Sequence, residues 1–172
     1  MEAVEKILEA YVRYVLEFFT IPNIKCANAE IDLIALSADG QKLHVESSVH
    51  IGSPFSELRL GDYKQVKDHA TSRRCLTFFI DRKFGHREVH QELLRRGFSP
   101  GSYRRVIVSW GWKPGVEQAA KEAGIELWDF RDILQKLRDE MRGKSSYFKD
   151  DALRTVQLLE LAKKEEAKRE KH

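Results

Sequence analysis

The chain has little of what several protein classes require. It contains two cysteines, Cys26 and Cys75, which are too few for a disulfide framework or a cysteine-based zinc site. No apolar run reaches the length of a membrane span, and the N-terminus lacks the basic-then-apolar layout of a signal peptide. These absences lead us to expect a cytoplasmic protein with two reduced thiols.

The composition that remains is that of a globular domain with a basic middle. Of 172 residues, 42% are apolar and 33% are charged, enough apolar chain for one sizeable core. The net charge is only +3, but residues 59–105 carry twelve Lys and Arg against five Asp and Glu. Such a block favours a polyanionic partner, nucleic acid first, although a solvated face of mixed charge has the same composition.

Hydrophobic periodicity predicts the order of helices and strands. Apolar residues recur at helical spacing over residues 2–19, and Pro22 follows where it would end the helix. Residues 30–36 and 42–50 alternate as strands, with turn residues 38–40 between them. The later predicted elements are a helix around 62–73, an apolar segment 75–80 that fits a strand or a buried helix, a helix over 87–96, strands over 106–110 and 125–128, and helices over 116–123 and 129–143.

This order predicts an α/β fold with three layers, in which a mixed central sheet carries helices on both faces. The first hairpin supplies an antiparallel pair, and the strand–helix–strand order after residue 105 favours parallel pairing. We expect residues 1–142 to form the domain, 143–149 a linker and 150–172 a C-terminal helical appendage.

The C-terminal helix has an apolar first half and an almost wholly charged second half. We expect the apolar residues to dock the helix on the body or on a partner protein through residues 150–162. These residues are Leu153, Val156, Leu159 and Leu161.

The hairpin carries the residues that suggest chemistry. In a strand, side chains alternate between faces, so Glu46 and Ser48 share one face of the second strand, and Asp32 lies on the adjacent strand. Asp32 is flanked by apolar residues, and a buried carboxylate is costly without a partner. Two carboxylates on neighbouring strands, with the Ser47 carbonyl between them, offer the hard oxygen ligands that Mg²⁺ or Mn²⁺ binds.

Two histidines lie on the same strand face as Glu46. His44 and His50 are six residues apart, roughly 20 Å along a strand, so they are too distant to share one ion. Only His44 is near enough to join Glu46, and we expect both histidines to be peripheral.

The acid-bearing hairpin, preceded by a helix and followed by alternating strands and helices, resembles the PD-(D/E)XK nuclease superfamily. That superfamily includes many restriction enzymes and the archaeal resolvase and Mrr-like nucleases, and the resemblance covers residues 1–142. It implies a restriction-endonuclease-like fold and metal-dependent hydrolysis of DNA phosphodiester bonds. Asp32 matches the first acid of the motif, Glu46 the second, and Ser48 the position of the lysine.

The same resemblance implies further residues at the site. An acid on the N-terminal helix often joins the metal, which points to Glu9, with Glu5 as the alternative. A glutamine or lysine on the helix after the hairpin often touches the site, which points to Gln65 or Lys64.

Ser48 departs from the motif, because a hydroxyl cannot replace an ammonium as a charge. Three explanations stay open. A lysine has moved, with Lys42, Lys64 and Lys67 as candidates; the metal acts alone, since it is the largest charge in such a site; or cleavage is lost and binding remains.

The basic block supplies candidate contacts to DNA phosphates, which position a duplex without reading its sequence. These candidates are Lys64, Lys67, Arg73, Arg74, Arg82, Lys83 and Arg87, together with Arg95, Arg96, Arg104 and Arg105.

The sequence thus predicts a Mg²⁺-dependent or Mn²⁺-dependent DNA endonuclease. A catalytically inactive nucleic-acid-binding module and a protein-interaction module on the same fold are the alternatives. A homodimer fits the nuclease and the binding module alike, because symmetric cutting of a duplex requires two sites related by a two-fold axis.

Overall fold

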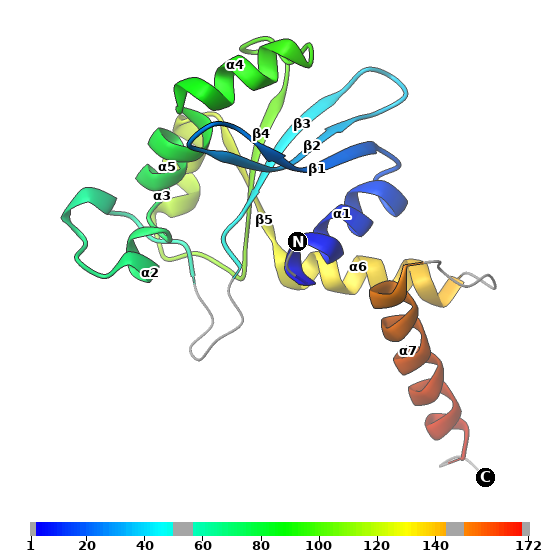
Figure 1. Cartoon of the computed structure of the whole chain (residues 1–172). Helices are drawn as coiled ribbons and strands as arrows, with labels where there is room; N and C mark the ends of the chain where they lie inside the picture. Colours follow the sequence, from blue (N-terminus) through cyan, green and yellow to red (C-terminus); the bar gives the residue numbers. More distant parts are fainter. Residues whose placement is uncertain (1–2, 50–56, 144–149, 170–172) are drawn as a thin grey trace.

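A five-stranded mixed sheet forms the centre of the molecule (Figure 1), in a computed structural model that describes residues 3–49, 57–143 and 150–169. The strands lie in chain order: β1 (Phe19–Lys25), β2 (Glu30–Leu36), β3 (Lys42–Ser47), β4 (Arg104–Ser109) and β5 (Ile125–Asp129). The first three pair antiparallel, and β3–β4 and β4–β5 pair parallel. The predicted α/β class and mixed sheet are confirmed.

Helices cover both faces of this sheet, as predicted. On one face lie α1 (Ala3–Tyr14) and α6 (Phe130–Gly143), whose apolar residues, among them Leu8 and Ile133, pack on Leu43 and Val45 of β3. The other face carries α3 (Leu76–Phe78), the π-helical turn η2 (Phe79–Phe84), α4 (Arg87–Arg95) and α5 (Val116–Glu122).

The N-terminal helix is shorter than predicted, and a strand follows it. Helix α1 ends at Tyr14, and Glu17 then adopts a left-handed backbone conformation with φ of 62°. Residues 19–25 form β1, where Pro22 pairs with Leu33 of β2. A proline is tolerated there because β1 is an edge strand. The helical spacing of the apolar residues up to Phe19 was therefore misleading.

The segment after the hairpin also differs from the prediction. Strand β3 ends at Ser47, and His50 lies outside the described residues. The predicted helix over 62–73 is two short turns, η1 (Tyr63–Gln65) and α2 (His69–Ser72). Each turn begins at its own aspartate cap, since Asp62 accepts from the Lys64 amide and Asp68 from the Thr71 amide.

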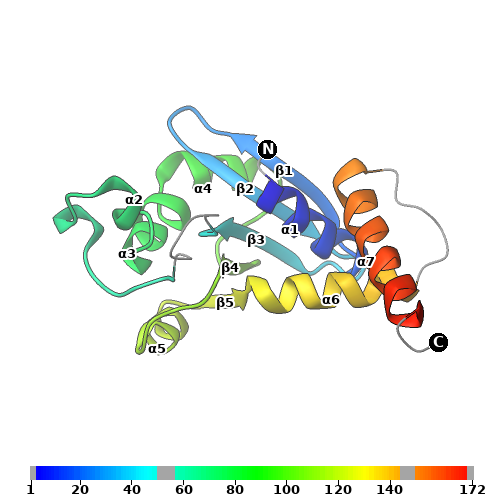
Figure 2. The ribbon, with the colours of Figure 1, turned by 90° about the horizontal axis from the view of Figure 1, so that it is seen from below.

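The C-terminal helix α7 (Asp151–Arg169) lies against α6 and α1 (Figure 2). Leu153 is buried there, and Glu160 accepts hydrogen bonds from Arg138 and Arg142. Leu159 and Leu161 do not dock the helix on the body, since both are exposed and Gln157 and Glu160 take the inner positions.

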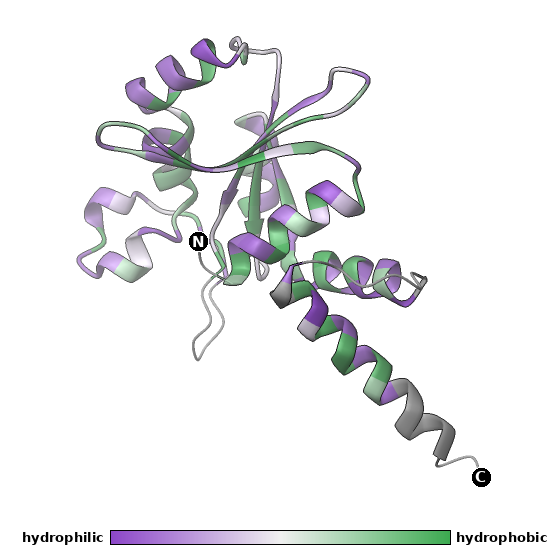
Figure 3. Cartoon of the chain, turned by 45° about the vertical axis from the view of Figure 1, so that its right-hand side comes forward, coloured by the Kyte–Doolittle hydropathy of each residue, from purple (hydrophilic) through white to green (hydrophobic). Residues whose placement is uncertain are grey.

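Along the exposed length of α7, hydrophobic and hydrophilic residues alternate (Figure 3). The partner protein expected at 150–162 stays a prediction. Residues 144–149 of the predicted linker lie outside the described residues. Among the helices of the described ranges, none is long and apolar enough to cross a membrane.

Candidate active site

Asp32 and Glu46 meet across two neighbouring strands. The register of β2 and β3 pairs Leu33 with Val45, so Asp32 stands opposite Glu46 on the other face of the sheet. Both side chains are withdrawn from solvent: that of Asp32 is 12% exposed and that of Glu46 is 0% exposed. The hairpin therefore brings the two acids together as the sequence predicted.

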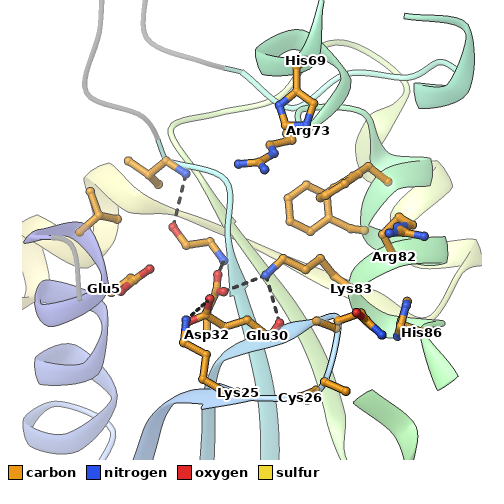
Figure 4. A pocket seen from close by; sticks show the side chains of 18 residues that line it. Glu5, Lys25, Cys26, Glu30, Asp32, His69, Arg73, Arg82, Lys83 and His86 are labelled. Carbon is orange, nitrogen blue, oxygen red and sulfur yellow. Dashed lines mark hydrogen bonds and ion pairs between the residues drawn. The ribbon is translucent and has the colours of Figure 1, made fainter. Parts of the chain in front are cut away.

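A lysine joins these two carboxylates, and it is Lys83. Its Nζ lies 2.8 Å from Asp32 Oδ1 (Figure 4). This nitrogen also lies 2.5 Å from Glu46 Oε2. The same nitrogen donates to the backbone carbonyl of Glu30 at 3.3 Å. Lys83, which the sequence predicts as a phosphate contact, therefore lies between the two acids; the phosphate contact stays a prediction.

The second oxygen of each carboxylate is also held. Asp32 Oδ2 accepts a hydrogen bond from the backbone amide of Ser47 at 2.7 Å. Glu46 Oε1 lies 2.7 Å from Nε2 of His44, whose side chain is fully buried. Both acids are thus fixed in orientation from two sides, which is the arrangement a preorganised site needs.

Burial shifts the pKa values of the ionisable groups at this site. It lowers the pKa of His44 to about 3, so the imidazole is neutral and donates from Nε2 to Glu46. Burial and the nearby Glu46 charge raise the pKa of Asp32 to about 7, and burial raises that of Glu46. Burial alone would lower the pKa of Lys83, but the charges of Glu46 and Asp32 outweigh it and raise that pKa. When both are ionised, the two carboxylates carry more negative charge than the Lys83 ammonium neutralises.

Asp32 and Lys83 line a cleft of about 700 Å³, and Glu46 lies behind them, fully buried. The walls of the cleft come from the start of α1, the turn between β1 and β2, helix α2 and the η2–α4 segment (Figure 4). Arg73 and Arg82 line it, and within the described part of the chain neither side chain has a hydrogen-bond or ion-pair partner. Two unpaired guanidinium groups beside a polar cleft favour an anionic ligand.

The donor set suits a hard divalent cation. Among the described residues, no group of three or more His, Cys, Asp and Glu side chains is clustered to hold a metal. Asp32 Oδ1 and Glu46 Oε2 nevertheless both contact Lys83 Nζ, so the two oxygens are directed to one position. Magnesium is commonly bound through one or two carboxylates and keeps several waters. The uncompensated negative charge of the pair also fits a bound cation.

The three lysines predicted to replace the motif lysine are not at the site. Lys42 donates to the Gly97 carbonyl at 2.6 Å and lies over the Phe98 ring. Lys64 faces Asp81 at 3.5 Å, and Lys67 is exposed. None of the three lines the cleft. Lys42 shares a strand face with Glu46, and Lys64 and Lys67 follow the hairpin in the sequence, whereas the ammonium at the acids comes from the later turn η2.

Two other residues predicted at the site, Glu9 and Gln65, lie outside the cleft. Glu9 is bound by Arg13 at 2.5 Å and by the Thr20 hydroxyl at 3.0 Å, away from the cleft, while Glu5 lines it. Gln65 is exposed and directed to Asp62. The alternative acid, Glu5, is the one positioned toward the site.

Ser47 and Ser48 differ in their surroundings. Ser47 lines the cleft, as its predicted role requires. Ser48 follows the end of β3, is 1% exposed and donates its backbone amide to Val108. The position of the motif lysine is therefore buried beside β4 rather than facing the cleft.

The other residues predicted to contact phosphate lie inside or outside the cleft. Neither Arg74 nor Arg87 lines the cleft. Arg95 and Arg96 pair with Glu92, Arg104 pairs with Glu126, and Arg105 donates to the Ala123 carbonyl. Of the predicted phosphate contacts, Arg73 and Arg82 are the arginines that line the cleft and have no side-chain partner among residues 3–49, 57–143 and 150–169.

Comparisons with known proteins give one structural likeness. No family model and no curated protein matches the sequence. Among solved structures, the chain is similar to a repair endonuclease from Pyrococcus abyssi, with a TM-score of 0.39 and 13% sequence identity. The match covers 73% of this chain and 46% of that one, so the chain spans less than half of its length.

Proposed function

We propose that the protein is a metal-dependent nuclease of the PD-(D/E)XK type that hydrolyses DNA phosphodiester bonds, with Lys83 in place of the motif lysine. The observation that carries this proposal is the bridge from Lys83 to Asp32 and Glu46 at a cleft that Asp32 and Lys83 line. Two acids and an ammonium converge there from three separate elements, and each acid is oriented by a second hydrogen bond.

The residues divide the chemistry among them. Asp32, Glu46 and the Ser47 carbonyl would hold Mg²⁺ or Mn²⁺, which lowers the pKa of a bound water and stabilises charge on the phosphate. Lys83 has three donors, and its charge stabilises negative charge that develops in the transition state. His44 keeps Glu46 in one orientation.

The substrate contacts follow from the unpaired cations. Arg73 and Arg82 line the same cleft as Asp32 and Lys83, so they would bind phosphates that flank the scissile bond. Such contacts act on the backbone and predict cleavage without strong sequence preference. Arg95 and Arg96 at the end of α4 and Arg104 on β4 are each paired with a glutamate, so they are weaker candidates for phosphate contacts than Arg73 and Arg82.

The experiment is a cleavage assay with matched substitutions of two glutamates. Purified protein is incubated with plasmid, linear, single-stranded and branched DNA in Mg²⁺, Mn²⁺ or EDTA, beside Glu46→Gln and Glu9→Gln. We expect cleavage that requires metal, is lost in Glu46→Gln and persists in Glu9→Gln, because Glu9 is bound by Arg13 away from the cleft.

Two other outcomes would redirect the proposal. DNA binding without cleavage on any substrate, with the same affinity in EDTA, would make the protein a binding module on this fold. Equal cleavage by wild type and Glu46→Gln would assign the activity to another site or to a contaminant.

A further inference from the structure

The helix that delivers Lys83 changes its pitch just before that residue. Helix α3 begins at Leu76 with ordinary α geometry and continues directly into the π-helical turn η2 (Phe79–Phe84). A π turn closes its hydrogen bonds over five residues instead of four, is rarely found and occurs frequently at functional sites.

The wider π turn allows two phenylalanines, Phe79 and Phe84, to be buried on the same side of the helix. Phe79 and Phe84 are each 1% exposed and belong to one core cluster with Ile107 of β4. Five residues apart in an α-helix, at about 100° per residue, their side chains would diverge by about 140°. In a turn that closes over five residues, both rings can face the sheet.

The second phenylalanine, Phe84, fixes the turn relative to the acids. The Phe84 ring meets the His44 ring edge-on, with centroids 4.8 Å apart, and His44 holds Glu46 at 2.7 Å. Lys83, the residue before Phe84, reaches the other oxygen of Glu46. Lys83 and Phe84 therefore fix the position of η2 relative to the Glu46 carboxylate, one directly and the other through His44.

Gly85 closes this turn because no side chain fits there. A Cβ on Gly85 would lie 2.6 Å from the Ile80 carbonyl oxygen and 3.1 Å from that of Asp81. Both neighbours are backbone atoms of the π turn, so they cannot swing aside as a flexible side chain would. The φ of Gly85 is −92°, which any residue adopts, so the requirement is for space and not for backbone freedom.

We propose that the π turn closed by Gly85 is the positioning element of Lys83, and that Gly85 is a positioning residue that acts through this ammonium. The catalytic consequence rests on the proposed nuclease function. The structural consequence does not: a side chain at residue 85 forces the turn to shift and withdraws Lys83 from Asp32 and Glu46.

The first test is a double-mutant cycle on cleavage. Gly85→Ala and Lys83→Met are each expected to lower the single-turnover cleavage rate at least tenfold, and Gly85→Ala is expected to cost less than twofold more in the Lys83→Met background. Asp81→Ala, an exposed position on the same turn, is the matched control and keeps wild-type activity. Losses that multiply fully would overturn the proposal, since Gly85 would then act independently of Lys83.

The second test needs no nuclease activity. Lys83→Met is expected to lower the melting temperature of the wild-type protein, and to lower that of Gly85→Ala by less than half as much. Equal shifts in the two backgrounds would overturn the positioning role even if cleavage is never observed. If Gly85→Ala does not fold, Phe84→Leu takes its place in both cycles, because it loosens the packing of residue 84, and full additivity with Lys83→Met would again refute the idea.

Discussion

Replacing Lys83 with methionine leaves two buried carboxylates without their cation. The side chains of Asp32, Glu46 and Lys83 are 12%, 0% and 21% exposed. Removing one partner of a buried ion pair costs about 3–5 kcal/mol. Because the site opens to a cleft, we expect the lower end, about 3 kcal/mol at pH 7.5, or roughly 6–12 °C in melting temperature.

The cost of Lys83→Met is expected to depend on pH in a definite direction. The folded-state pKa of Asp32 is raised from 3.8 to about 7, so its protonated form is favoured by folding, and stability is lost as the pH rises from about 4 through 7. Without Lys83 this pKa rises further, since the lysine charge lowers it. At pH 4.5 the acids take up protons, and the cost falls to less than half its value at pH 7.5.

Urea unfolding followed by tryptophan fluorescence at pH 4.5 and 7.5 measures both effects. Lys42→Met is the matched control, because it removes the same charge from a lysine bound to the Gly97 carbonyl outside the cleft. A cost that is equal at both pH values, or no larger than that of Lys42→Met, would refute the reasoning that Lys83 neutralises buried carboxylates.

Three further predictions concern the metal, the cleft and the C-terminal helix. Mg²⁺ at ten times its dissociation constant raises the free energy of unfolding by about 1.4 kcal/mol, more at pH 8 than at pH 5 and not in Asp32→Asn, which scanning calorimetry measures. Arg73→Ala and Arg82→Ala each weaken DNA binding and reduce its salt slope by about 1, whereas Arg104→Ala, which is paired with Glu126, leaves the slope unchanged; fluorescence anisotropy across a salt series decides this. Glu160→Gln removes the charge that Arg138 and Arg142 hold and lowers stability by about 1 kcal/mol; the Glu160 pKa is lowered by these partners, so this effect is present above pH 4.5 and disappears as the pH falls further.

The acid pair was predictable because its signal is local. Period-two alternation assigns side chains to strand faces, and a short turn between 36 and 42 fixes the hairpin register. Asp32 and Glu46 therefore had to approach one another once the hairpin was recognised. The alternation of strands and helices after residue 105 gave the mixed sheet by the same kind of local reasoning.

Lys83 was predicted only as a phosphate contact, and its place between the two acids was not predictable because the signal for it is not local. Lys83 is 37 positions after Glu46 in the sequence, and its direction depends on a turn whose pitch changes at Phe79. The trace of this change is the pair Phe79 and Phe84, two large apolar residues five positions apart and followed by glycine. That spacing fits neither a strand nor an α-helix.

Strand β1 was missed for a different reason. Its first residue, Phe19, continues the helical spacing of α1, and Pro22 indicates an interruption rather than a strand. A proline within a strand is tolerated at the sheet edge, and edge position is a property of the whole sheet, which no local pattern contains.

The central claim is that Lys83 supplies the site ammonium of a metal-dependent nuclease, and single-turnover cleavage of DNA in Mg²⁺ tests it most directly. The variants are Lys83→Met, Lys42→Met and Lys64→Met, each measured at saturating protein and with DNA binding checked separately. We expect Lys83→Met to cleave about 100–1000-fold more slowly, as when one stabilising donor is removed from an active site, with the other two near wild type. Wild-type cleavage by Lys83→Met, or loss in Lys42→Met or Lys64→Met instead, would contradict the account.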